Sequence, residues 1–172
     1  GVELLIGILD LGAAQDPEGD VRLAAVINLG LLEDARAVPH LIALLDDENE
    51  DEGLRTATAG ALGLLEGPGL REALIAALAD SSLKGRGTAA FSLSKLVPPA
   101  HEAQGVLLEL TDVAIYERIH AQDPTKYARA RDVSANRILA LGALARLDGP
   151  DDWAHIQSLR DDPDANVVDA VL

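Results

Sequence analysis

A stretch of about 32 residues recurs along the chain, and this repetition constrains the fold more than any other feature. Residues 21–47 align with residues 54–81, and the landmark residues Arg22 and Arg55 are 33 positions apart. A third copy places Arg86 31 positions after Arg55. A period in the low thirties is typical of supersecondary units that stack on one another. The chain is therefore expected to be built from copies of one small unit.

A fourth copy spans residues 133–162. We align its Leu141 and Gly142 with the Leu-Gly pairs of the earlier copies, such as Leu29 and Gly30. This alignment puts Ser134 at the position that the other copies fill with arginine. We interpret the serine as a residue that bonds locally to helix carbonyls.

Apolar residues within each copy follow a helical period, and each copy contains two such stretches. Val21, Ala25 and Leu29 fall on one stripe, and Leu41 and Leu45 form the next stripe after a break. Each copy is therefore predicted to be a helical hairpin, which gives an all-α solenoid of about four hairpins with partial repeats at both ends. A single hairpin cannot bury its own apolar face, so the unit is copied and stacked.

The repeat resembles HEAT-like repeats of the short type named after phycobilin lyase subunits, and residues 20–30 and 57–80 carry the resemblance best. The resemblance implies one HEAT-like or armadillo-type superhelix over residues 1–172. In HEAT-like proteins the second helix of each hairpin usually lies on the concave face. By resemblance, the residues exposed on that face are expected to be Arg71, Glu72, His101, Glu102, Gln104 and Gln157.

The third and fourth copies are separated by an insertion of about 16 residues, because Leu93 and Leu141 are 48 positions apart. Ile115 and Ile119 continue the apolar stripe of the preceding helix, and Asp123–Pro124 is a helix start signal. Both helices are therefore predicted to be lengthened, forming a protruding hairpin at about residues 112–132.

This predicted hairpin differs chemically from the rest of the chain, since residues 113–137 contain five basic and three acidic residues. Exposed tyrosine and arginine are enriched at interface hot spots. One interpretation is a protein contact, and the other is that the tyrosines clamp the hairpin while the arginines pair with the acidic surface. The first interpretation nominates Tyr116, Arg118, His120, Lys126, Tyr127, Arg129 and Arg131 as partner-binding residues.

Composition removes several functional classes. The formal net charge is -15, which repels a phosphate backbone and disfavours nucleic acid. The absence of cysteine excludes disulfides, Cys-ligated zinc and thiol nucleophiles, and it leaves the redox compartment undetermined. No apolar run reaches the roughly 18 residues of a membrane span and no signal peptide is visible, so a cytoplasmic location is expected. A metal ion requires converging ligands from different helices. Only one His-Glu pair occurs, His101–Glu102, so no metal site is expected. The acidic residues 46–52 do not have the ligand order of an EF-hand loop and read as a solvated loop.

No nucleophile elbow or phosphate-binding loop is present, so no catalytic residue and no cofactor are expected. The leading hypothesis is a non-catalytic scaffold that binds a protein with a basic surface, on an acidic concave face, on the 112–132 hairpin, or on both. The alternative that the resemblance offers is a subunit of an enzyme such as a bilin lyase, although fold alone does not fix function.

Overall fold

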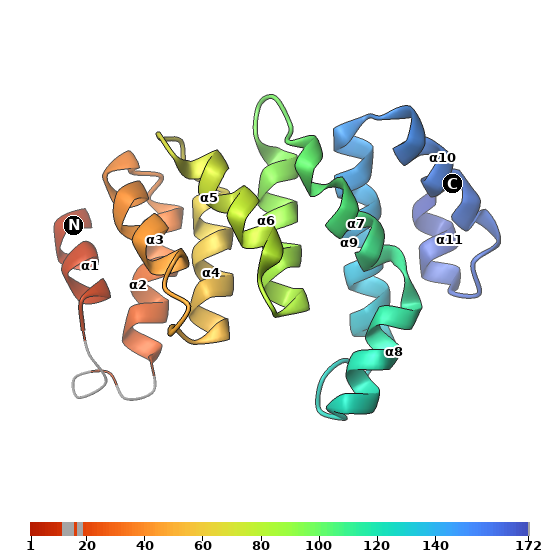
Figure 1. Ribbon diagram of the computed structural model, residues 1–172, viewed down its shortest axis with the longest axis horizontal. Helices are drawn as coiled ribbons and strands as arrows, with labels where there is room; N and C mark the ends of the chain where they lie inside the picture. The colour runs from red at the N-terminus through yellow and green to blue at the C-terminus, as the bar shows by residue number, and fades with distance from the viewer. Residues whose placement is uncertain (12–15, 17–18, 172) are drawn as a thin grey trace. The chain divides into compact units, whose positions relative to one another are not determined.

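The computed structural model describes residues 1–11, 16 and 19–171 (Figure 1). All regular structure in these residues is helical, which confirms the predicted all-α repeat fold. The chain divides into two compact units, residues 1–96 and residues 97–172. The longer single solenoid over residues 1–172 stays a prediction, and each unit is described by itself.

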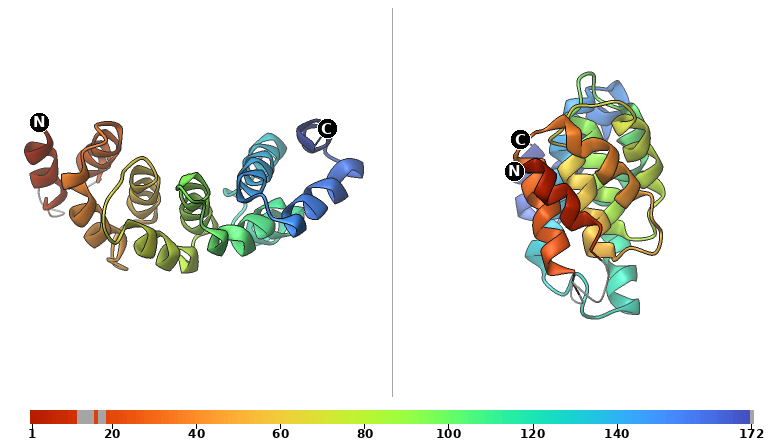
Figure 2. Two further views of the ribbon diagram at one scale, coloured as in Figure 1. Left: turned by 90° about the horizontal axis from the view of Figure 1, so that it is seen from above. Right: turned by 90° about the vertical axis from the view of Figure 1, so that its left-hand side faces the viewer.

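The first unit contains six α-helices among its described residues. They are α1 (Val2–Leu9), α2 (Asp20–Leu31), α3 (Val38–Leu45), α4 (Glu52–Leu62), α5 (Leu70–Ala76) and α6 (Leu83–Lys95), with 3-10 turns at Ala35–Ala37 and Ala77–Ala79. Helices α2, α4 and α6 pack side by side in one row, and α3 and α5 form a second row against them (Figure 2). This is the two-layer arrangement that the hairpin repeat predicts.

Helix starts in this unit follow from local capping. The Asp51 side chain accepts hydrogen bonds from the backbone N–H groups of Gly53 and Leu54, and the Ser82 hydroxyl accepts from Gly85 N–H. Both residues stand just before the apolar positions of α4 and α6, and such caps satisfy donors that have no partner within the helix. Capping therefore fixes where the first helices of successive repeats begin.

The core of the first unit lies between the two rows. Val26, Leu29, Leu62, Leu74 and Leu93 are fully buried there. The Leu-Gly landmark of the repeat has a packing reason, because a Cβ atom added at Gly30 would lie 2.9 Å from both Cα and Cβ of Ala61. Glycine at this position lets α2 approach α4 closely.

The second unit is organised around one long helix. Its helices are α7 (Gln104–Thr111), α8 (Val113–Gln122), α9 (Ala130–Leu147), α10 (Pro150–Ser158) and α11 (Ala165–Val171), with 3-10 turns at His101–Ala103 and Leu159–Asp161. Helix α9 packs against α7, α10 and α11. Leu107 and Leu144 are fully buried in its core.

The insertion is not the pair of lengthened helices that the sequence predicts. Helix α7 ends at Thr111, and Asp112 has an extended backbone and caps a separate helix, α8, by accepting from Ala114 N–H at 2.9 Å. The predicted helix restart at Asp123–Pro124 is also wrong, because α9 begins at Ala130. Only α9, with 18 residues, is longer than the corresponding helices α2, α4 and α6.

The alignment of the fourth repeat also needs correction, by three residues. Arg137, and not Ser134, occupies the position of the repeat arginine, because Arg137 makes the same contacts as Arg22 and Arg55. Leu29 and Leu62, which follow Arg22 and Arg55 by seven positions, are fully buried, and in the fourth repeat the equivalent buried leucine is Leu144. Gly142 is not the packing glycine, since a Cβ atom added there would meet nothing within 4 Å.

Candidate protein-interaction site

Residues 112–132, here called the insertion segment, form helix α8 and a closed turn that leads into α9. The Asp123 carboxylate accepts hydrogen bonds from the backbone N–H and the hydroxyl of Thr125, at 3.0 and 2.6 Å. These bonds from Thr125 hold the pKa of Asp123 below its ordinary value. His120 Nδ1 lies 2.9 Å from the Lys126 carbonyl oxygen across the same turn. The turn is thus held by its own side chains.

Tyr116 anchors the insertion segment to helix α7, and Tyr127 packs against Tyr116. Tyr116 is 1% exposed, and its hydroxyl donates a 2.9 Å hydrogen bond to the carbonyl oxygen of Leu110 at the end of α7. Burial raises the pKa of Tyr116 well above its ordinary value. The Tyr127 ring meets the Tyr116 ring edge to face, with 4.9 Å between centroids and an interplanar angle of 79°. The expectation that Tyr116 is exposed for a partner is therefore wrong, whereas the clamping interpretation describes this pair.

The basic side chains of the insertion segment lie on its surface. Arg118, Lys126, Arg129 and Arg131 are all exposed, as is His120. Arg131 makes only a loose ion pair with its neighbour Asp132, at 3.6 Å, and both side chains are mostly solvent-accessible. Residues 112–132 therefore present four basic side chains beside four acidic ones, Asp112, Glu117, Asp123 and Asp132, so the segment is neutral on a chain whose formal net charge is -15.

Arg137 does not lie with these exposed basic side chains, although residues 113–137 include it. Its side chain is 5% exposed, and it pairs with Asp162 through two hydrogen bonds. Its Nε also donates to the Thr111 carbonyl oxygen at 2.7 Å. Arg137 therefore belongs to the core of the second unit.

The residues nominated on the second helices fall in different units. Arg71 and Glu72 lie at the start of α5 in the first unit, half-buried and exposed respectively. In the second unit, His101, Glu102 and Gln157 are exposed. Their use in binding stays a prediction.

Gln104, the sixth of these nominated residues, has a structural role instead of an open side chain. Its Nε2 donates to Asp152 Oδ1 at 2.8 Å, which ties α7 to α10. Asp152 is fully buried, and it also accepts from Gly149 N–H at the start of α10. Gln104 satisfies a buried carboxylate in this way, as a buried charge requires.

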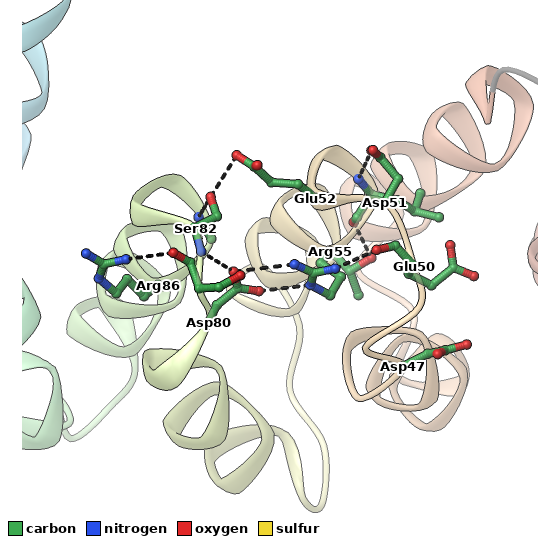
Figure 3. A network of polar contacts seen from close by, with 12 residues as sticks. Asp47, Glu50, Asp51, Glu52, Arg55, Asp80, Ser82 and Arg86 are labelled. Carbon is green, nitrogen blue, oxygen red and sulfur yellow. Dashed lines mark hydrogen bonds and ion pairs between the residues drawn. The ribbon is translucent and has the colours of Figure 1, made fainter. Parts of the chain in front are cut away.

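A recurring arginine clamp, missed by the sequence interpretation, connects neighbouring repeats. In the first unit, Arg55 donates to both oxygens of Asp80, at 2.9 and 3.5 Å, and to the Glu50 carbonyl oxygen at 2.5 Å (Figure 3). Arg22 pairs in the same way with the Glu50 carboxylate and the Leu9 carbonyl oxygen. Arg22 thus holds the end of α1 and Arg55 holds the loop between α3 and α4. Each of the two also pairs with a carboxylate that follows the second helix of its own repeat.

Two of the three clamps share one spacing in the sequence, whereas Arg22 and Glu50 are 28 residues apart. Asp80 follows Arg55 by 25 residues, and Asp162 follows Arg137 by the same number. A search for Arg and Asp pairs at this spacing would have found Arg137, and would have corrected the alignment of the fourth repeat. The bidentate geometry is the one in which arginine and carboxylate interact most strongly.

A pocket of about 480 Å³ opens beside this clamp in the first unit. Its apolar wall includes Leu45 and Ala76, and its polar groups are Asp46, Glu48, Arg55, Asp80 and Ser81. Arg55 and Asp80 are already bonded to each other, so the remaining carboxylates give the pocket negative charge.

No group of three or more metal-binding side chains occurs among residues 1–11, 16 and 19–171. Over the same residues, no helix is both long and apolar enough to traverse a bilayer.

The comparisons with known proteins agree with this architecture. A family model of HEAT repeats matches residues 10–112, more than half of the chain, so the chain belongs to the HEAT repeat family. A search of curated protein sequences gives no match.

Among solved structures, the chain is similar to one from the complex of CpcE and CpcF of phycocyanin lyase from Nostoc sp. PCC7120, with 25% sequence identity and a TM-score of 0.71. That alignment covers 99% of this chain and 62% of the other, so this chain spans less than two thirds of its length. An engineered protein is similar at 17% identity and a TM-score of 0.53, over 99% of this chain and 76% of that one, which shows the fold alone.

Proposed function

We propose that the chain is a non-catalytic HEAT-repeat module that binds another protein, with the insertion segment as one contact surface. The observation that carries this proposal is the set of exposed cations on a segment held in place by Tyr116 and Asp123. Groups that are fixed before binding lose less conformational entropy on association. The similar structure is described as a complex of two proteins, which supports a protein partner.

The partner meets two kinds of surface on this chain. The insertion segment offers arginines, which favour carboxylates on the partner. The acidic remainder of the chain favours a basic surface, because complementary charges steer association and suppress wrong partners. Protein capture should therefore weaken as the salt concentration rises.

A charge-reversal experiment tests the role of the insertion segment. The variant Arg118→Glu/Arg131→Glu is compared with Arg146→Glu/Arg160→Glu, which reverses two exposed arginines elsewhere in the second unit. Both variants and the wild-type chain serve as bait in a lysate of the source organism. We expect a protein captured by the wild type and by the second variant to be lost from the first. Equal capture by all three would remove the insertion segment from the proposal.

A second candidate function is a subunit of a bilin lyase, favoured by the similarity to a chain of phycocyanin lyase. In this case the protein partner would be a second lyase subunit. Incubation of the chain with a free bilin, alone and with the captured partner, should then shift the visible absorbance of the bilin. A spectrum unchanged under both conditions would rule this candidate out and leave the binding module.

A further inference from the structure

The outward side of the first-helix row in the first unit is apolar, although residues 1–96 contain 16 acidic and only 7 basic residues. On α2, the stripe that faces away from the core contains Ala24, Ile27, Asn28 and Leu31, all exposed, and the Asn28 amide donates back to the Ala24 carbonyl oxygen. Ile27 is 48% exposed and Leu31 67%. Residues three and four apart lie on one face of a helix, so these side chains form one continuous strip.

The neighbouring repeat has residues at the equivalent positions, two of them on α4 and the third in the turn that follows α4. Ala57, Gly60 and Leu64 follow Ala24, Ile27 and Leu31 by 33 residues each. Leu64 is 45% exposed, while Ala57 and Gly60 are partly covered. Helices α2 and α4 pack side by side, and the two strips together are here called the α2–α4 face. Its core-facing counterparts, such as Leu29 and Leu62, are fully buried and play the packing role of the repeat.

Packing within the unit does not require large apolar side chains on this outward face. Leu31 and Leu64 are both exposed, and they occupy the same position in two successive repeats. Contiguous apolar patches on a protein surface mark interaction sites more often than scattered single residues do. Of the small residues in these strips, Ala24 is exposed and allows another backbone to come close, whereas a Cβ atom added at Gly60 would lie 3.5 Å from the Thr88 side chain of α6.

Acidic residues flank both ends of the α2–α4 face. Asp20 and Asp51 stand at the N-terminal ends of α2 and α4, and Glu33 and Glu66 follow their C-terminal ends, all four exposed. The equivalent strip of α6 begins and ends instead with Lys84 and Lys95. The acidic ends are thus specific to α2 and α4.

We infer that the α2–α4 face binds an amphipathic helix of a partner protein that has leucine-like residues on one side and Lys or Arg towards both ends. An apolar helix side laid along an apolar face is a common mode of peptide recognition. Helix α2 is 12 residues and hence about 18 Å long, so a partner helix of some three turns spans the face from one acidic end to the other. This inference rests on the proposed function, because it names the chemistry of a partner for the same module.

A peptide titration tests the inference without the natural partner. The probe is a fluorescein-labelled 18-residue helical peptide of Leu and Lys with one apolar side. A scrambled peptide of the same composition and an amphipathic Leu and Glu peptide serve as comparisons. Binding to the whole chain is followed by fluorescence anisotropy. We expect the amphipathic basic peptide to bind at least tenfold more tightly than the other two.

The variant Ile27→Glu/Leu64→Glu locates the binding surface, with Leu4→Glu/Val97→Glu as a control that places the same charges at exposed apolar residues outside the face. The new carboxylates increase the attraction for a basic peptide, so weaker binding must come from lost apolar contact. We expect at least a tenfold loss for the first variant and no change for the control, with circular dichroism spectra unchanged.

Equal binding of the scrambled peptide, unchanged binding by the face variant, or no binding of any peptide would overturn the inference. These results leave the proposed function intact if the lysate experiment still captures a protein through the insertion segment. Loss of capture in that experiment, with specific peptide binding retained, would instead count against the insertion segment alone.

Discussion

Arg137 and Asp162 are joined by two hydrogen bonds, Nη1 to Oδ1 at 3.0 Å and Nη2 to Oδ2 at 2.5 Å, with side chains only 5% and 7% exposed. The pair connects α9 to the segment between α10 and α11, and Arg137 also holds the end of α7 through the Thr111 carbonyl oxygen. One side chain thus links three parts of the second unit.

Removal of Arg137 should strongly destabilise the second unit. We expect Arg137→Met to lower the free energy of unfolding by about 3–5 kcal/mol, because it leaves the buried Asp162 carboxylate without its partner. Urea denaturation followed by circular dichroism measures the change. The matched control is Arg118→Met at an exposed arginine of the same unit, expected to change stability by about 0.5 kcal/mol or less. Similar losses in the two variants would contradict the clamp.

Acid should weaken the same pair. The hydrogen bonds from Arg137 hold the pKa of Asp162 below its ordinary value. The unfolded chain ionises this carboxyl near pH 4, so its stabilising contribution is complete above about pH 5 and is lost as the pH falls through the lower folded-state pKa. Wild-type stability should therefore fall more steeply from pH 5 to pH 2 than that of Asp162→Asn. Urea midpoints that fall by the same amount in both chains from pH 5 to pH 2 would show that the Asp162 carboxylate does not cause the loss of stability in acid.

Two glycines should respond to alanine in opposite directions. A Cβ at Gly30 would meet the Ala61 backbone at 2.9 Å, so Gly30→Ala is expected to cost about 1–3 kcal/mol despite the better helix propensity of alanine. A Cβ at Gly142 meets nothing within 4 Å, so Gly142→Ala should stabilise α9 by up to about 1 kcal/mol. Thermal unfolding measures both. A destabilised Gly142→Ala protein would restore the original alignment of the fourth repeat.

The Tyr116 hydroxyl should contribute to stability and not to partner capture. Tyr116→Phe removes its hydrogen bond to the Leu110 carbonyl oxygen, which we expect to cost about 1–2 kcal/mol. Because Tyr116 is buried, capture of a partner at a temperature where the variant is folded should equal that of the wild type. Capture that disappears while the circular dichroism spectrum is retained would show that the hydroxyl has a role in binding.

The sequence predicted the repeat and its helices because burial of one helical stripe repeats at every copy. It did not predict the end of α7 at Thr111, because Ile115 lies on the continued apolar stripe even though Asp112 starts a new helix. Apolar spacing cannot distinguish a capping aspartate from an exposed one, and the cap bond from Ala114 N–H decides between them. A helix that starts at Asp123–Pro124 would include Tyr127, whereas the φ of 51° at Tyr127 belongs to a turn.

The candidate site was also predictable from the sequence only in part. Composition correctly indicated exposed arginines in residues 112–132, since charged side chains seldom lie buried without a partner. Arg137 was the exception, because its partner Asp162 lies 25 residues further along the chain and only tertiary structure brings the two together. Apolar residues at exposed positions, such as Leu31 and Leu64, were indistinguishable from core residues in the periodic pattern.

The most direct test of the account is amide hydrogen exchange on the chain, free and bound to the protein that it captures. If the chain is a binding module that uses its insertion segment, exchange in residues 112–132 should slow at least tenfold on binding, while helix α1 (Val2–Leu9) serves as an internal reference. Exchange in residues 112–132 that is the same in the free and bound chain would contradict the account.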